Sequence, residues 1–161
     1  MPGPALHHVA FACRDIDETH RFYGEVLGLR LVHCEVTPYD QGYFRHTFYD
    51  LGDGSSLAFF DLHGAGEPQP IRTAISEDLG LPIWVNHLAL RVDDEREAEL
   101  VARLADAGHE PLLAMSHGWC FSTYYQDPNG IMVELCRDTP GVPDEPERAL
   151  ADLHATPDGV G

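Results

Sequence analysis

Hydrophobic and polar residues follow one another along the chain in an order that occurs twice. Residues 6–13 alternate weakly and favour a strand, after which Ile16, Tyr23 and Leu27 recur at helical spacing. Gly28 follows as a helix-ending glycine. Three further strand-like runs come next, at residues 29–36, 43–51 and 56–62. The first part of the chain therefore predicts a βαβββ unit.

The second part of the chain predicts the same order of elements. A strand is expected at residues 85–92, and a helix at residues 97–107 ends at Gly108. An extended piece at residues 111–115 and two strands, 120–126 and 131–136, follow. The last two strands are joined by the turn Asp127-Pro128-Asn129-Gly130. This unit is again βαβββ.

Individual residues support an internal repeat. The matched pairs are His8-Val9-Ala10-Phe11 with His87-Leu88-Ala89-Leu90, Asp15 with Asp94, Gly28 with Gly108, and Asp53-Gly54 with Asn129-Gly130. We therefore predict an α+β fold in which two paired βαβββ modules, residues 1–63 and 83–138, form one domain around one cavity. Residues 64–82 are rich in glycine, proline and acids and are expected to be a linker or a covering loop. Residues 139–161 form a C-terminal tail, with a short helix expected within residues 143–153.

Charge and composition exclude several classes of partner. The chain has 161 residues, with 10 Lys and Arg against 27 Asp and Glu, for a net charge of −17. Nucleic acids and anionic membrane surfaces attract basic proteins, so neither is an expected partner. No apolar run approaches the roughly 20 residues of a spanning helix, and no leader pattern opens the sequence, which favours a cytoplasmic location. The four cysteines lack metal-finger spacing and are expected to be mostly small buried thiols.

Glu134 is the most informative polar residue, because it stands in the apolar run 131–136. If the strand alternates, Ile131, Val133 and Leu135 face the core while Glu134 faces water. If that face is covered, the carboxylate needs a cation or a metal ion, since a lone buried charge costs several kcal/mol. The pattern alone leaves both interpretations open.

The whole pattern resembles the vicinal oxygen chelate superfamily, which groups glyoxalases, bleomycin-resistance proteins, fosfomycin-modifying thiol transferases and extradiol dioxygenases. The similar segments are LHHVAFACRDIDETHRFYGEVLGLRL, NHLALRVDD and YYQDPNGIMVEL. The resemblance implies paired βαβββ modules whose cupped mixed sheet holds a divalent metal. It also implies a small-molecule substrate, aromatic or oxygen-chelating. Members complete the cup either within one chain or by exchanging modules between two chains, and we expect a homodimer.

The resemblance implies a metal site made by His8, His87 and Glu134. Aligning Gly54 with Gly130 places Ala58 at the fourth ligand position, and alanine cannot bind a metal. Two histidines and one carboxylate suit Fe(II) and leave coordination positions open, while Mn(II), Ni(II) and Zn(II) are alternatives. His46 is a further residue that could line the cavity. Five other histidines have no partner pattern, and we expect them to be solvated: His20, His33, His63, His109 and His154.

The run from His117 to Glu134 is similar to the extradiol dioxygenase signature. It implies that a catechol chelates the metal, that Tyr124 hydrogen-bonds a substrate oxygen, and that His117 donates to the incoming ligand or excludes water. Thr123 and Ser55-Ser56 depart from that pattern, the latter replacing an acid/base histidine.

Three other functions stay open. A glyoxalase-like lyase or isomerase is one. A fosfomycin-type thiol transferase is another, although it would need cations such as Arg45, Arg72, Arg91 or Arg137 for a phosphonate. A non-enzymatic drug-binding protein is the last, and it would use an aromatic cup drawn from Phe44, Phe48, Phe59, Phe60, Trp84, Trp119 and Phe121.

Overall fold

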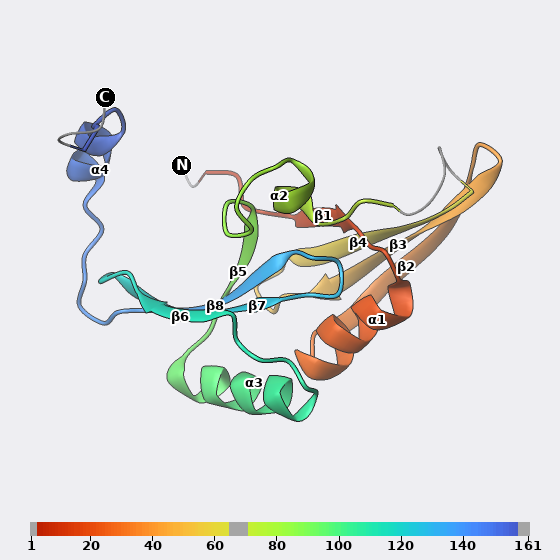
Figure 1. Cartoon of the computed structure of the whole chain (residues 1–161), viewed down its shortest axis with the longest axis horizontal. Helices are drawn as coiled ribbons and strands as arrows, with labels where there is room; N and C mark the ends of the chain where they lie inside the picture. Colours follow the sequence, from red (N-terminus) through yellow and green to blue (C-terminus); the bar gives the residue numbers. More distant parts are fainter. Residues whose placement is uncertain (1–2, 65–70, 158–161) are drawn as a thin grey trace.

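The computed structural model describes residues 3–64 and 71–157 and contains two four-stranded mixed sheets (Figure 1). The first module comprises β1 (His8–Ala12), α1 (Ile16–His20), a π-helical turn η1 (Arg21–Val26), β2 (Arg30–Tyr39), β3 (Gly42–Asp50) and β4 (Ser56–His63). The second comprises β5 (His87–Arg91), α3 (Asp94–Asp106), β6 (Leu113–Ser116), β7 (Cys120–Gln126) and β8 (Met132–Asp138). The predicted α+β fold with two βαβββ modules is confirmed.

Both sheets have the same strand order. In the first, β1 pairs in parallel with β4, which is followed by β3 and β2; in the second, β5 pairs in parallel with β8, followed by β7 and β6. The other neighbours are antiparallel, as expected for strands joined by short turns. The exact limits predicted for the modules, linker and tail stay a prediction.

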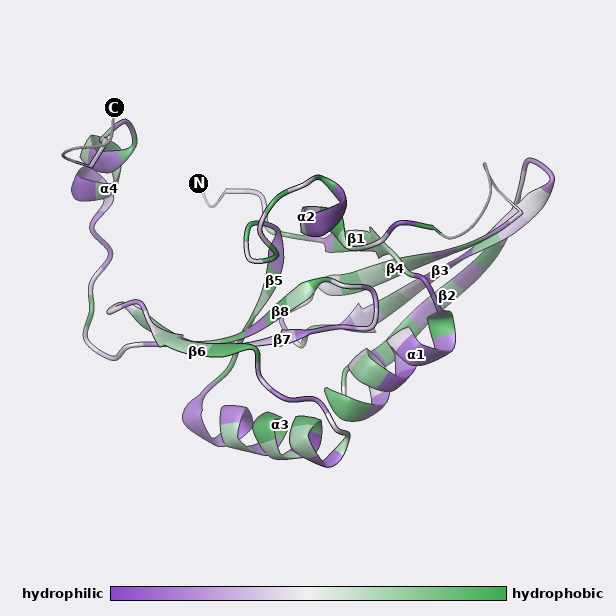
Figure 2. Ribbon diagram, viewed as in Figure 1, coloured by the Kyte–Doolittle hydropathy of each residue, from purple (hydrophilic) through white to green (hydrophobic). Residues whose placement is uncertain are grey.

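The helices begin and end at the residues that their caps require. Asp15 accepts hydrogen bonds from the backbone N–H groups of Asp17 and Glu18, and Asp93 accepts one from that of Arg96. Gly108 has φ +83°, the left-handed conformation that ends a helix at a glycine. Figure 2 shows α3 with both hydrophilic and hydrophobic residues, as an amphipathic helix over a sheet should have.

One hydrophobic core joins the two modules. It includes Tyr23, Leu57 and Phe59 of the first module with Tyr125 and Leu135 of the second. The helices α1 and α3 lie on the same side of the strands in Figure 1. Each sheet therefore has one face packed into this core and one open face.

The turn between β7 and β8 connects the modules through buried polar contacts. The Tyr23 hydroxyl donates to Asp127 Oδ2 at 2.9 Å, and the Arg14 backbone N–H donates to Asn129 Oδ1 at 2.8 Å. The Thr73 hydroxyl donates to the Asn129 carbonyl at 2.7 Å, which holds part of the linker against the same turn. Burial raises the pKa of Asp127, although the hydrogen bonds from Asn129, Ile131 and Tyr23 oppose that shift.

Part of the predicted linker or covering loop has regular structure. Residues 75–78 form a short helix, α2 (Ile75–Asp78), and the Ser76 hydroxyl accepts a hydrogen bond from the Asn86 backbone N–H at 2.8 Å. Because Ser76 is buried against the start of the second module, tertiary contacts order a segment whose sequence has no periodicity. Residues 65–70 of the linker lie outside the described residues.

The C-terminal tail forms the predicted short helix, α4 (Pro146–Asp152), at the end of an extended segment (Figure 1). Its residues are exposed throughout. None of the helices within residues 3–64 and 71–157 is long and apolar enough to cross a membrane.

Candidate functional site

The strand register places the two predicted ligand sets at equivalent positions of the two sheets. His8 and Ala10 of β1 lie opposite Ser56 and Ala58 of β4. His87 and Ala89 of β5 lie opposite Met132 and Glu134 of β8. Ala58 is therefore the structural equivalent of Glu134, as the aligned glycine turns predicted. The open face of the first sheet thus has an alanine where that of the second has a carboxylate.

His87 and Glu134 are brought into direct contact. His87 Nε2 lies 2.9 Å from Glu134 Oε2, and His87 Nδ1 lies 2.9 Å from the Trp84 carbonyl oxygen. A carbonyl only accepts hydrogen bonds, so Nδ1 carries the proton, and a neutral ring then turns the Nε2 lone pair toward the carboxylate. Two acceptors at this distance need a cation between them, either a proton or a metal ion. These two atoms are close enough for one divalent metal ion to bind both of them.

Glu134 lies on the open face of the second sheet, and its side chain is nevertheless shielded from solvent. It is 5% exposed, and the Ser122 hydroxyl donates to its Oε1 oxygen. Val133 and Leu135 belong to the core, as strand alternation predicts, while the interpretation of Glu134 as a solvated side chain is wrong. Neighbouring side chains of β5 and β7 cover that face, which a single strand pattern cannot reveal.

Tyr124 and His117 stand beside this pair. Tyr124 is the cross-strand partner of Glu134, and its hydroxyl lies 2.9 Å from His117 Nε2. Burial, with Glu134 nearby, raises the pKa of the Tyr124 phenol, so it stays protonated and able to donate at neutral pH. His117 itself lies in the exposed turn between β6 and β7. The two side chains are in contact, and their predicted catalytic roles stay a prediction.

His8 lies on the open face of the first sheet, where its ring neighbours are His7, His46 and Phe48. It does not join His87 and Glu134 in any group of metal-binding atoms found among residues 3–64 and 71–157. One chain therefore carries His87 and Glu134 on one open face and His8 on another. That His8, His87 and Glu134 bind one ion stays a prediction.

His46 shares the open face of the first sheet. It is 8% exposed, its ring stacks on Phe60 with centroids 3.8 Å apart, and Nδ1 lies 3.3 Å from Glu35 Oε1. Its Nε2 atom is buried and has no hydrogen-bond partner in the described part of the chain. His46 therefore lines the same face as His8, one of the two orientations that the sequence left open.

Two thiols next to Glu134 were missed by the sequence analysis. Cys120 Sγ, Cys136 Sγ and a carboxylate oxygen of Glu134 all lie within 4.8 Å of one another. Cys120 is buried, Cys136 is half-buried, and burial raises the pKa of the Cys136 thiol to about 11. The sequence contained this signal, because residues two apart on a strand share a face. Cys120 and Ser122 are such a pair on β7, and Glu134 and Cys136 are such a pair on β8.

Two histidines predicted to be solvated have partners instead. His63 Nε2 lies 2.7 Å from Asp61 Oδ2, and the His63 ring stacks on Tyr43 with centroids 4.5 Å apart. His20 Nδ1 lies 3.0 Å from the Tyr49 hydroxyl. These contacts lie on the helix-covered side of the first sheet, with Arg45 donating to Asp61 at 2.6 Å. Tyr49 is distant from His20 in sequence, so local sequence gave no sign of that contact. Asp61, in contrast, lies two residues before His63 on the same strand, a local signal that was missed.

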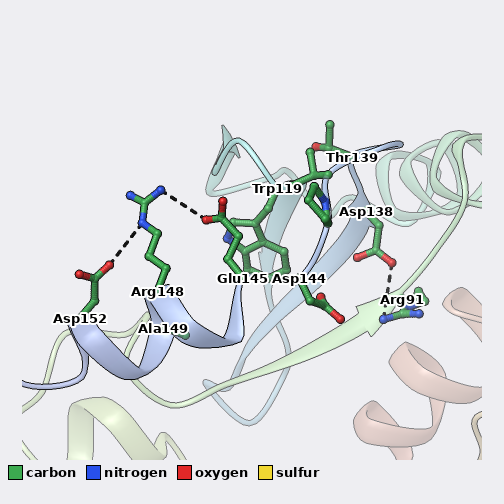
Figure 3. A pocket seen from close by; sticks show the side chains of 11 residues that line it. Arg91, Trp119, Asp138, Thr139, Asp144, Glu145, Arg148, Ala149 and Asp152 are labelled. Atoms are coloured by element: carbon green, nitrogen blue, oxygen red, sulfur yellow. Dashed lines mark hydrogen bonds and ion pairs between the residues drawn. The ribbon is translucent and has the colours of Figure 1, made fainter.

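A cavity of about 790 Å³ lies away from these residues, between the end of the second sheet and the C-terminal tail (Figure 3). Trp119 lines it, and both of its arginines are paired: Arg148 contacts Glu145 and Asp152, and Arg91 contacts Asp138. The exposed α4 forms one wall of this cavity. Its lining includes none of the five predicted site residues.

Comparison with known proteins identifies similar sequences. The profile of the Glyoxalase/Bleomycin resistance protein/Dioxygenase superfamily matches residues 5–135. The chain is 44% identical over 69 residues to "Putative ring-cleaving dioxygenase MhqE" of Bacillus subtilis strain 168, a match that spans 42% of this chain and 23% of that protein. It is 27% identical over 164 aligned residues to "Biphenyl-2,3-diol 1,2-dioxygenase 3" of Rhodococcus globerulus, spanning 98% of this chain and 76% of that protein.

Solved structures agree on the fold. A glyoxylase/bleomycin resistance protein/dioxygenase domain from Frankia sp. EAN1pec has a TM-score of 0.61 at 20% identity, covering 88% of this chain and 96% of that one. The fosfomycin resistance protein FosX from Listeria monocytogenes has a TM-score of 0.60 at 18% identity, covering 87% and 97%. At these identities the likeness shows the fold alone.

Proposed function

Because the chain belongs to the Glyoxalase/Bleomycin resistance protein/Dioxygenase superfamily, we propose that it is a metal-dependent enzyme which cleaves the ring of a catechol-like molecule. The observation that carries this proposal is the pair formed by His87 Nε2 and Glu134 Oε2, 2.9 Å apart, with Tyr124 beside it. The names of the two similar curated proteins, both ring-cleaving or diol dioxygenases, support the same class of reaction.

His87 and Glu134 would hold the ion, with His8 as the third ligand, and Fe(II) suits two imidazoles and one carboxylate. When bound, such an ion supplies open positions for two substrate oxygens and for dioxygen. The Trp84 carbonyl fixes the tautomer of His87, which keeps Nε2 available as a ligand. Tyr124 would donate its hydroxyl proton to a substrate oxygen, while His117 holds that hydroxyl in position.

We propose further that two copies of the chain complete each site. The open face of the first sheet in one copy would cover the open face of the second sheet in the other copy. His8 of one chain would then meet His87 and Glu134 of its partner. Phe48 beside His8 and Phe60 beside His46 would bind the substrate ring and exclude water. A cytoplasmic location stays a prediction of the sequence.

The arginines argue against a phosphonate-binding thiol transferase. Each of the four cations weighed for that role makes an ion pair: Arg45 with Asp61, Arg72 with Asp78, Arg91 with Asp138, and Arg137 with Asp94 and Glu97. A phosphonate pocket needs cations that are free to bind the anion. These side chains are engaged by carboxylates of the same chain.

The experiment is an oxygen-uptake assay. Protein reconstituted anaerobically with Fe(II) is mixed with a panel of catechols and exposed to air, and oxygen consumption is followed with the yellow product of cleavage beside the diol. We expect turnover in the native protein and its loss in His8→Ala, His87→Ala and Glu134→Ala, because each removes a ligand. His154→Ala, which changes an exposed histidine of the tail, serves as the matched control.

Iron content separates the outcomes. Bound iron that depends on His87 and Glu134, without oxygen uptake on any catechol, would contradict ring cleavage and favour the lyase or isomerase. Uptake of apolar ligands by a protein that binds no metal would favour the drug-binding protein.

A further inference from the structure

The second sheet carries a group of metal-binding atoms that the proposed reaction does not use. Cys120 Sγ, Cys136 Sγ and a Glu134 carboxylate oxygen lie within 4.8 Å of one another on its open face. All three come from the neighbouring strands β7 and β8 of one chain. The proposed iron site, in contrast, takes His8 from another sheet.

Strand geometry explains why these groups converge. Ser122 pairs directly with Cys136 across the strands, Cys120 lies two residues before Ser122, and Glu134 two residues before Cys136. Residues two apart on a strand share a face, so all four side chains point the same way. The Ser122 Oγ atom lies 3.8 Å from each sulfur and donates to Glu134 Oε1. A small hydroxyl thus stands at the centre of the three donors.

The two oxygens of Glu134 face different partners. Oε2 lies 2.9 Å from His87 Nε2, while Oε1 faces Ser122, which also contacts the two thiols. The carboxylate therefore borders two donor sets, one with imidazole and one with sulfur. Thiolate sulfur selects thiophilic ions, whereas imidazole and carboxylate suit the iron of the proposed reaction.

We propose that Cys120, Cys136 and Glu134 Oε1 bind a thiophilic divalent cation of the Zn²⁺ type within a single chain. At Zn–S bond lengths of about 2.3 Å, tetrahedral donors lie about 3.8 Å apart, so the group contracts by about 1 Å at most as Ser122 rotates aside. Binding releases the two thiol protons and leaves the fourth position to solvent. Because Glu134 belongs to both donor sets, this ion competes with the reaction metal.

The test uses Co²⁺ alone as a spectroscopic probe of the full chain under reducing conditions. Thiolate ligands give Co²⁺ an intense near-ultraviolet charge-transfer band, whereas oxygen and nitrogen ligands give no such band. We expect the band in the native protein, loss of at least about half of it in Cys120→Ser and in Cys136→Ser, and no change in Cys34→Ser. Cys34 is the matched control because its thiol is exposed on the first sheet.

His8→Ala separates this site from the proposed iron site. That variant loses a ligand of the reaction metal and keeps all three donors of the thiolate site, so its Co²⁺ band stays unchanged. A band that disappears with His8, or with Cys34, overturns the proposal. So does a native protein that is folded and fully reduced and yet shows no band.

Buried Cys120 could fail to tolerate substitution, so a second measurement uses the native sequence. Alkylation of the thiols is followed by mass spectrometry with and without saturating Zn²⁺. We expect Zn²⁺ to abolish alkylation of the half-buried Cys136 and to leave that of the exposed Cys34 unchanged. Equal alkylation of Cys136 in both conditions contradicts the site.

Discussion

At the scale of single residues, neighbouring tyrosines on opposite faces of β7 provide a test of the proposed reaction. Tyr124 contacts His117 on the open face, whereas the hydroxyl of core-facing Tyr125 has no hydrogen-bond partner in the described part of the chain. If the Tyr124 hydroxyl stabilises charge that develops on a substrate oxygen, Tyr124→Phe should lower kcat roughly tenfold or more and change KM much less. Steady-state oxygen uptake measures both constants. Tyr125→Phe is the control, and equal losses in the two variants would contradict the role of Tyr124.

Asn129 is a second residue whose contribution can be measured directly. It is fully buried, and its side chain bonds the Arg14 backbone, Thr19 and Asp127. Asn129→Ala should lower the free energy of unfolding by roughly 2–4 kcal/mol, because each buried polar group left without a partner costs about 1–3 kcal/mol. Urea denaturation measures this change. A loss below about 1 kcal/mol would show that water replaces the side chain.

At the scale of elements, two glycines with the same backbone conformation should respond differently to alanine. Gly108 after α3 and Gly130 before β8 both have φ +83°. A Cβ at Gly108 meets nothing within 4 Å, so only backbone strain of about 1 kcal/mol is expected. A Cβ at Gly130 would lie 2.7 Å from Ala74 Cβ, which adds a steric clash and raises the expected loss to at least about 2 kcal/mol. Thermal unfolding of the two variants, compared side by side, tests this order.

The elements also show how far the sequence could be interpreted without the structure. Hydrophobic periodicity predicted both βαβββ modules, and the matched glycine turns correctly identified Ala58 as the equivalent of Glu134 in the first sheet. The short helix α2 was missed because Ser76 and its contact with Asn86, not local periodicity, order that segment. The thiols beside Glu134 were missed for a different reason. Both strands and their turn were predicted, but the register between them, which brings Cys120 and Cys136 next to Glu134, was not worked out.

At the scale of the whole molecule, the position of His8 decides how the proposed site is built. His87 and Glu134 occupy one open face, His8 the other, and the core lies on the opposite side of both sheets. If two chains complete each site, the protein should be a dimer at micromolar concentration, with twice the 17.9 kDa mass of one chain by light scattering. A mass near that of one chain, with full activity, would contradict the shared site.

Mixing two inactive variants tests the shared site more sharply than the mass does. His8→Ala lacks a ligand of one half-site and Glu134→Ala lacks a ligand of the other, so each homodimer should be inactive. When the two are unfolded and refolded together, half of the dimers are mixed, and one of the two sites in each mixed dimer has all its native ligands. We therefore expect roughly a quarter of the native oxygen uptake to return. His87→Ala mixed with Glu134→Ala is the matched control, because each change removes a ligand from the second sheet of its own chain, so neither site of a mixed dimer is intact. Recovery in that control, or none in the first mixture despite proven subunit exchange, would show that the three ligands do not come from two chains.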